Sequence, residues 1–146
     1  GPLDLIIFEG WCVGSTELPD EQLGEPVNRL EAEQDADCAW RRYVNERLAT
    51  DYKALFRMID ALVFLEAPSF EAIHDWRLEQ ERKLADSDGT DGTDGKHVMD
   101  EAGLAGFIQH YERITRHNLA TLPSRADVVL SLGEDHAVTR MRGSKA

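Results

Sequence analysis

The sequence has 146 residues and a mass of 16.4 kDa, with 42% hydrophobic and 30% charged residues, which fits one soluble globular domain with a hydrophobic core. Its 28 acidic and 16 basic residues give a formal net charge of −12. This charge argues against a general nucleic-acid or anionic-membrane surface, because clustered Lys and Arg bind phosphate groups. The two cysteines, Cys12 and Cys38, form no disulfide framework and predict a reducing, cytoplasmic setting.

Three apolar runs predict strands, at residues 4–8, 61–65 and 127–132. Unbroken β-branched and aromatic runs of this length are typical of strands buried on both faces of a parallel sheet. No apolar run approaches the roughly 18 to 20 residues that span a bilayer, so we expect no membrane partner.

Three longer segments have helical periodicity, at residues 39–60, 70–84 and 100–122. In the first, an apolar stripe that includes Trp40, Tyr43 and Val44 is expected to face the core, with Arg and Glu on the other side. Ser69 precedes the second segment and is its expected N-cap. Strands that alternate with helices predict an α/β fold. Residues 13–25 contain two Gly and Pro19 and are expected to form a mobile loop. Residues 86–95 (DSDGTDGTDG) are acidic and Gly-rich and predict a flexible linker.

Neither G-x-x-x-x-G-K-[ST] nor G-x-G-x-x-G occurs in the chain, although an α/β nucleotide-binding domain needs a Gly-rich phosphate-binding turn. The sequence also opens on an apolar run that is expected to be a core strand, whereas chain termini usually lie at surfaces. We therefore expect upstream elements that are not in this sequence.

Five segments together resemble the P-loop kinase family of D-glycerate 3-kinase, which is kin to uridine kinase and phosphoribulokinase. The resemblance covers about residues 4–138 and is carried by residues 8–14 (FEGWCVG), 40–45 (WRRYVN), 76–81 (WRLEQE), 107–113 (FIQHYER) and 126–130 (ADVVL). Cys38 stands where the family has Gly, and Ser15 stands where it usually has an aromatic residue.

The resemblance implies a three-layer P-loop NTPase-type parallel sheet in the strand order 2-3-1-4-5, with the P-loop after strand 1. The three runs would be strands 3, 4 and 5, so residues 1–146 would be the C-terminal part of one kinase domain, with a flexible lid insert at 86–95. Strand 1 would separate residues 4–8 from 61–65. We therefore expect an open sheet edge that makes the chain unstable or aggregation-prone on its own.

The resemblance also implies site residues. Glu9 would be the acid at a strand end that holds Mg²⁺ through water or accepts a proton from the attacking hydroxyl, although an ordinary polar strand end is the alternative. Gly10 and Trp11 would shape the acceptor pocket; Trp11 is equally well explained as a core residue. On the third helix, Arg113 would clamp an acceptor carboxylate and Tyr111 would line the pocket, with a core position as the alternative for Tyr111.

Arg77 and Arg82 lie on the helix that would form the kinase lid, where arginines neutralise charge on the transferred phosphoryl group or bind nucleotide. Their alternative is a solvated helix face, on which Arg77 and Glu81 form an i,i+4 pair.

The sequence thus indicates a fragment of an ATP-dependent small-molecule kinase that uses Mg²⁺, acts on D-glycerate or a similar sugar acid, and is inactive alone. Two alternatives stay open: an acidic helical binding protein derived from a kinase, and one half of a split kinase. A complete binding protein should cover residues 5–8 on both faces, whereas a fragment leaves one ladder open.

Overall fold

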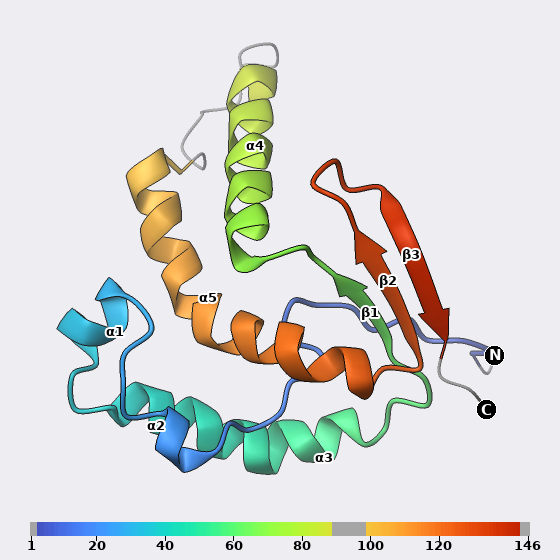
Figure 1. Cartoon of the computed structure of the whole chain (residues 1–146), viewed down its shortest axis with the longest axis horizontal. Coiled ribbons are helices and arrows are strands. Elements are labelled where there is room, and N and C mark those ends of the chain that lie inside the picture. The colour runs from blue at the N-terminus through green and yellow to red at the C-terminus, as the bar shows by residue number, and fades with distance from the viewer. Residues whose placement is uncertain (1–2, 89–98, 144–146) are drawn as a thin grey trace.

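The computed structural model describes residues 3–88 and 99–143, which fold as a small sheet at one end of a set of helices (Figure 1). No helix within these two ranges is long and apolar enough to cross a membrane. The helices are α1 (Arg29–Gln34), α2 (Ala39–Arg47), α3 (Lys53–Phe56), α4 (Phe70–Asp88) and α5 (Glu101–Thr121), and the strands are β1 (Val63–Glu66), β2 (Val128–Leu132) and β3 (Val138–Gly143).

The sheet has the order β1-β2-β3. β1 pairs in parallel with β2, with Val63 opposite Val128, which confirms the parallel pairing expected for the second and third apolar runs. β3 was not predicted and pairs with β2 in the antiparallel direction, so the expectation of a purely parallel sheet is wrong. Most of β3 is exposed, and its charged side chains are typical of an edge strand.

The expectation of a strand at residues 4–8 is wrong for the part of the chain that the structure describes. This segment is extended but pairs with none of the described strands. Its apolar side chains are largely exposed, with Leu5 at 76% and Ile7 at 82%. A strand needs a ladder partner to bury such side chains, and no described segment supplies one.

The predicted helix at 39–60 is observed as α2, a π-helical turn (Leu48–Tyr52) and α3, and it ends at Phe56. Its buried face carries Arg41, Asn45 and Leu48. Trp40 is 68% exposed, so the apolar stripe that was expected to face the core faces outward over much of its length.

α4 and α5 begin where the sequence predicts. The Ser69 hydroxyl accepts a hydrogen bond from the backbone N–H of Ala72 at 3.1 Å, which confirms Ser69 as the cap of α4. Phe70, Leu104 and Ile108 pack into a core cluster between the two helices. Residues 86–88 were expected in a flexible linker but continue α4, and residues 89–95 lie outside the described ranges.

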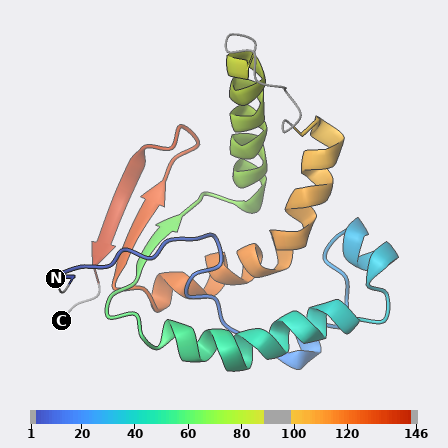
Figure 2. The same ribbon diagram turned by 180° about the vertical axis from the view of Figure 1, so that it is seen from behind.

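Residues 13–25, expected to be a mobile loop, are fixed by buried contacts. Leu18 and Leu23 are buried in a cluster with Cys38, and the Cys38 thiol donates to the Leu23 carbonyl at 3.0 Å. The Asn45 side-chain amide donates to the Leu18 carbonyl and accepts from the Leu18 N–H, so it forms the same pair of hydrogen bonds that a neighbouring strand would form. Seen from behind, this segment runs from the sheet toward α5 and α2 (Figure 2).

Candidate functional site

The loop that follows the exposed apolar run carries Glu9. A turn closes this loop, with the Val13 N–H donating to the Gly10 carbonyl at 3.3 Å. Gly14 has φ of +80°, and a Cβ there would lie 3.0 Å from the Leu62 side chain, so glycine suits both the conformation and the close approach. Glu9 is exposed, and its carboxylate takes part in no hydrogen bond or ion pair within residues 3–88 and 99–143.

Two predicted acceptor-site residues meet next to this loop. The rings of Trp11 and Tyr111 stack with centroids 4.8 Å apart and an interplanar angle of 16°. The Trp11 indole N–H donates to the Thr115 hydroxyl at 2.9 Å. Trp11 is therefore fixed at both its ring face and its polar edge, and α5 sets the position of the Glu9 loop.

Polar side chains of α5 that the sequence reasoning missed hold the rest of this loop. Asn118 donates to the Ser15 hydroxyl at 2.8 Å, and both residues are buried. The His117 ring nitrogen Nε2 lies 3.2 Å from the Thr16 hydroxyl. Burial lowers the pKa of His117, and the nearby charge of Arg125 lowers it further. Asn118 follows Thr115 by three residues on one helix face, and that spacing was the available signal.

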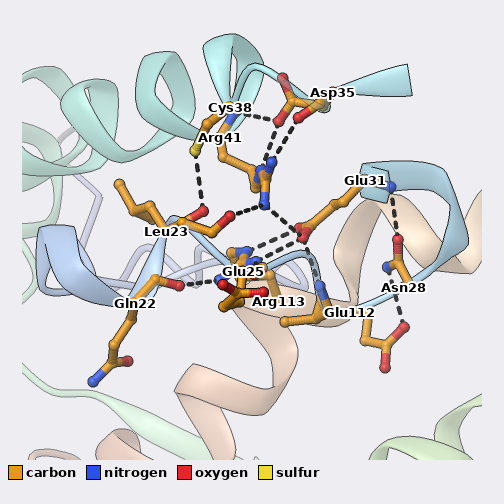
Figure 3. A network of polar contacts seen from close by, with 12 residues as sticks. Gln22, Leu23, Glu25, Asn28, Glu31, Asp35, Cys38, Arg41, Glu112 and Arg113 are labelled. Carbon is orange, nitrogen blue, oxygen red and sulfur yellow. Dashed lines mark hydrogen bonds and ion pairs between the residues drawn. The ribbon is translucent and has the colours of Figure 1, made fainter. Parts of the chain in front are cut away.

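Arg113 lies in a separate buried network (Figure 3). Its Nε and Nη2 atoms donate to the two carboxylate oxygens of Glu31 at 2.8 and 2.6 Å. Its Nη1 and Nη2 atoms also donate to the carbonyls of Gln22 and Glu25, each at 2.6 Å. The sequence predicts that Arg113 clamps an acceptor carboxylate, and in this conformation the carboxylate that it holds belongs to the chain itself.

Arg41, from α2, reaches the same network. Its Nη1 atom lies 3.6 Å from Glu31, and its Nε atom donates to Asp35 at 2.8 Å. The side chains of Arg41 and Arg113 are only 5% and 10% exposed. Arg113 of α5 and Arg41 of α2 therefore both lie beside the single carboxylate of Glu31.

The electrostatics of the network stabilise the charged form of both acids. Burial alone would raise the pKa of Glu31, but hydrogen bonds from Arg113 and the Val27 N–H, with the charges of Arg113 and Arg41, lower it overall. For Asp35, burial is likewise outweighed by the Trp40 N–H and by Arg41, and its pKa is lowered. The network therefore contains ion pairs and not neutral acids.

A cavity of about 520 Å³ opens above these ion pairs between α1, α2 and α5. Its walls are largely apolar, and one wall continues to Tyr111 and so to the Trp11 stack. The main apolar lining residues are Leu18, Leu23, Leu30, Trp40, Val44 and Ile114. This combination of apolar side chains with convergent polar groups, Arg41 and Arg113 among them, is typical of a small-molecule pocket.

The two arginines predicted for the lid lie on α4 (Figure 1), whose Trp76 indole N–H donates to the Glu134 carbonyl between β2 and β3 at 2.7 Å. Arg77 forms the expected i,i+4 pair with Glu81, at 3.2 Å, and Arg82 is exposed. No hydrogen bond or ion pair in the described ranges joins either arginine to the Glu9 loop. The predicted site residues therefore fall in three places: the Glu9–Trp11 loop with Tyr111, the buried network of Arg113, and the surface of α4.

Glu9 fits one way of binding Mg²⁺. This ion keeps several waters and is commonly held by one or two carboxylates together with substrate phosphates. The described residues gather no cluster of three or more His, Cys, Asp or Glu that would form an all-protein metal cage. An exposed, uncommitted carboxylate suits a water-mediated contact to a metal ion carried by nucleotide.

Comparison with known proteins gives consistent results. The chain is 38% identical over 107 residues, 73% of its length, to the uncharacterized kinase mug58 of Schizosaccharomyces pombe, and covers 35% of that protein. It is 30% identical over 131 residues, 87% of its length, to the chloroplastic D-glycerate 3-kinase of Arabidopsis thaliana, and covers 25% of that protein. No family model matches the chain.

Among solved structures, D-glycerate 3-kinase from Cryptococcus neoformans var. grubii matches with a TM-score of 0.70 at 19% identity. The match covers 99% of this chain and 51% of that one, and it shows that the two share a fold. These findings confirm the resemblance to glycerate kinase-like proteins, and the chain spans about a quarter to a third of the curated relatives it matches.

Proposed function

We propose that this chain, a relative of D-glycerate 3-kinase, is the C-terminal part of one P-loop kinase domain and supplies its acceptor site and lid. The complete kinase would transfer the γ-phosphoryl group of ATP to a hydroxyl of D-glycerate or a similar sugar acid, in the cytoplasm. The observation that carries the proposal is the sequence similarity to two kinases over most of this chain. Because the P-loop motif is absent from the sequence, we expect the chain alone to be inactive.

Within this proposal Glu9 acts at the acceptor hydroxyl. Its exposed carboxylate, on a loop that Trp11 fastens to α5, would accept the hydroxyl proton or hold a metal-bound water. Gly10 lets the loop approach a ligand closely, and the Trp11–Tyr111 stack walls the pocket. Mg²⁺ bound with ATP would neutralise charge on the phosphates.

The charged residues of the helices complete the proposed site. Arg113 would bind the acceptor carboxylate in the two-pronged geometry that it now uses for Glu31. Arg77 and Arg82 would reach the transferred phosphoryl group and the nucleotide when α4 closes as a lid. Arg77 would leave Glu81 to do so.

The exposed apolar residues 4–8 support a partner segment that carries the P-loop, in the same polypeptide or in a separate chain of a split kinase. Leu5 and Ile7 are 76% and 82% exposed, and the described part of the chain covers neither. The second candidate function is an acidic interaction protein derived from a kinase. The exposed side chains of Trp40, Tyr43 and Val44 on α2 favour it, because such faces are typical of protein contacts.

A phosphoryl-transfer assay distinguishes the two functions. The complete gene product is incubated with ATP, Mg²⁺ and a panel of hydroxy acids, and ADP release and phosphorylated product are measured. We expect release that depends on D-glycerate or a close analogue, and a fall in kcat of about 10²-fold or more for Glu9→Gln. The matched control is Glu21→Gln, an exposed carboxylate outside residues 9–14, which should keep full activity. If no acceptor raises ADP release above the ATPase background, the kinase proposal fails and the interaction protein becomes the better explanation.

A further inference from the structure

α1 is attached to the rest of the molecule by polar contacts. Its one buried residue among the described side chains is Glu31. The Asn28 amide donates to the Gln109 carbonyl at 2.9 Å, and the Leu30 N–H donates to the Gln109 side chain at 2.9 Å. Because this segment buries so little apolar surface, its ion pair and hydrogen bonds supply most of what holds it against α5.

The segment that contains α1 is fixed at both ends. Leu23 and Cys38 are each 4% exposed and belong to one apolar cluster, and the Cys38 thiol bonds to the Leu23 carbonyl. Residues 24–37 connect these two fixed points. Asp35, the C-cap of α1, binds Arg41 through its own carboxylate, so Arg41 keeps a partner when the Glu31 side chain leaves.

The Glu31 carboxylate is held by arginine in the way that proteins hold the carboxylate of a bound ligand. Arg113 holds both of its oxygens, and Arg41 lies 3.6 Å from one of them. Paired N–H···O bonds from one guanidinium are the usual way in which proteins bind a ligand carboxylate. The cavity of about 520 Å³ that Arg41, Arg113 and Glu31 line provides space for the remainder of such a ligand.

We propose that Arg113 and Arg41 form a binding site for small carboxylic acids in this cavity. Glu31 occupies the site in the conformation described. An incoming carboxylate replaces Glu31 and so releases α1. The ligand class follows in part from the proposed function, because a hydroxy-acid acceptor carries such a group. Carboxylate binding itself requires no phosphoryl transfer.

The exchange conserves charge at the buried arginines. One carboxylate leaves and another enters, so neither buried guanidinium is left without a counter-charge. Glu31 moves to solvent, where an acid needs no partner. Chloride lacks the paired oxygens that satisfy Nε and Nη2 together, so the site should select carboxylates over chloride at equal ionic strength.

The first test is calorimetric titration of the complete gene product with sodium acetate and with sodium D-glycerate, at constant ionic strength set by sodium chloride. We expect Glu31→Ala to bind acetate at least tenfold more tightly than the wild type, because the competing carboxylate is gone. Glu33→Ala is the matched control, since Glu33 is an exposed acid of the same helix, and it should bind like the wild type. The double variant Glu31→Ala, Arg113→Gln should lose the gain. Equal affinity of Glu31→Ala and the wild type, or an equal gain in Glu33→Ala, would overturn the proposal.

The second test uses the wild type and does not depend on a variant that folds. Acetate at saturating concentration should raise hydrogen–deuterium exchange of the amides of α1 and leave that of α5 unchanged, while chloride has no effect. Unchanged exchange in α1 would contradict the proposal. If acetate exposes α1 but the complete enzyme makes no phosphorylated product, this inference stands and the proposed function fails. If the enzyme makes product but acetate leaves α1 unchanged, the proposed function stands and this inference fails.

Discussion

Replacing Arg113 by Met tests whether the buried network stabilises the fold. The substitution keeps the length and apolar part of the side chain and removes three contact groups: the Glu31 carboxylate and the carbonyls of Gln22 and Glu25. Removing one partner of a buried ion pair costs about 3–5 kcal/mol, because the other charge stays buried. Glu31 keeps Arg41 at 3.6 Å, so we expect a loss near the lower end, about 3 kcal/mol.

Urea denaturation followed by far-UV circular dichroism measures this loss. For a slope of roughly 1–3 kcal/mol per molar urea, the midpoint should fall by about 1–3 M. Arg29→Met is the matched control, because it removes an exposed i,i+4 pair with Glu33 and should leave the midpoint unchanged. If Arg113→Met unfolds at the same urea concentration as Arg29→Met, the network does not hold the helices together and the reasoning is refuted.

Three further predictions follow from burial and charge. Leu104→Ala leaves a cavity at a fully buried position between α4 and α5 and should lower the free energy of unfolding, measured by urea denaturation, by about 2–5 kcal/mol. The control Met58→Ala, at a 73% exposed position, should change the urea midpoint little. Because the folded pKa of Glu31 is lowered, the stability that this acid contributes is fully present above the ordinary carboxyl pKa of about 4.3 and is lost as pH falls through the lowered value. The urea midpoint of the wild type should therefore fall in acid, and that of Glu31→Gln should fall less. Equal falls in the two proteins would contradict this. Ile7→Lys should reduce aggregation measured by static light scattering, since Ile7 lies in the exposed apolar run, and unchanged scattering would place the aggregating surface elsewhere.

The sequence predicted those elements whose own residues decide them. α4 and α5 begin at side-chain caps, Ser69 and Asp100, and their apolar positions meet in one cluster. β1 and β2 lie within apolar runs and pair in parallel as expected. β3 was missed because a charged edge strand has no apolar run.

The helix at α2 shows where an apolar pattern misleads. The stripe of Trp40 and Tyr43 predicted the inward face, but the structure buries Arg41 and Asn45. Arg41 is satisfied by Asp35, and Asn45 by the backbone of Leu18. Partners that lie elsewhere in the chain make polar burial favourable, and periodicity carries no information about them.

The candidate site was predicted only in part for the same reason. The pairing of Trp11 with Tyr111, a hundred residues apart, follows from the fold and not from local spacing. α1 has six residues and no apolar stripe, yet Asn28 followed by Glu31 matches the spacing of a capping box. That pattern was the available signal both for α1 and for the acid that binds Arg113.

The central claim, that this chain works with a P-loop supplied from outside its own sequence, is tested most directly by reading the coding DNA immediately upstream. We expect an in-frame G-x-x-x-x-G-K-[ST] motif behind an apolar strand, within about 100 residues. A start codon at the first residue, with no separate P-loop chain that restores phosphoryl transfer to D-glycerate on mixing, would contradict the claim.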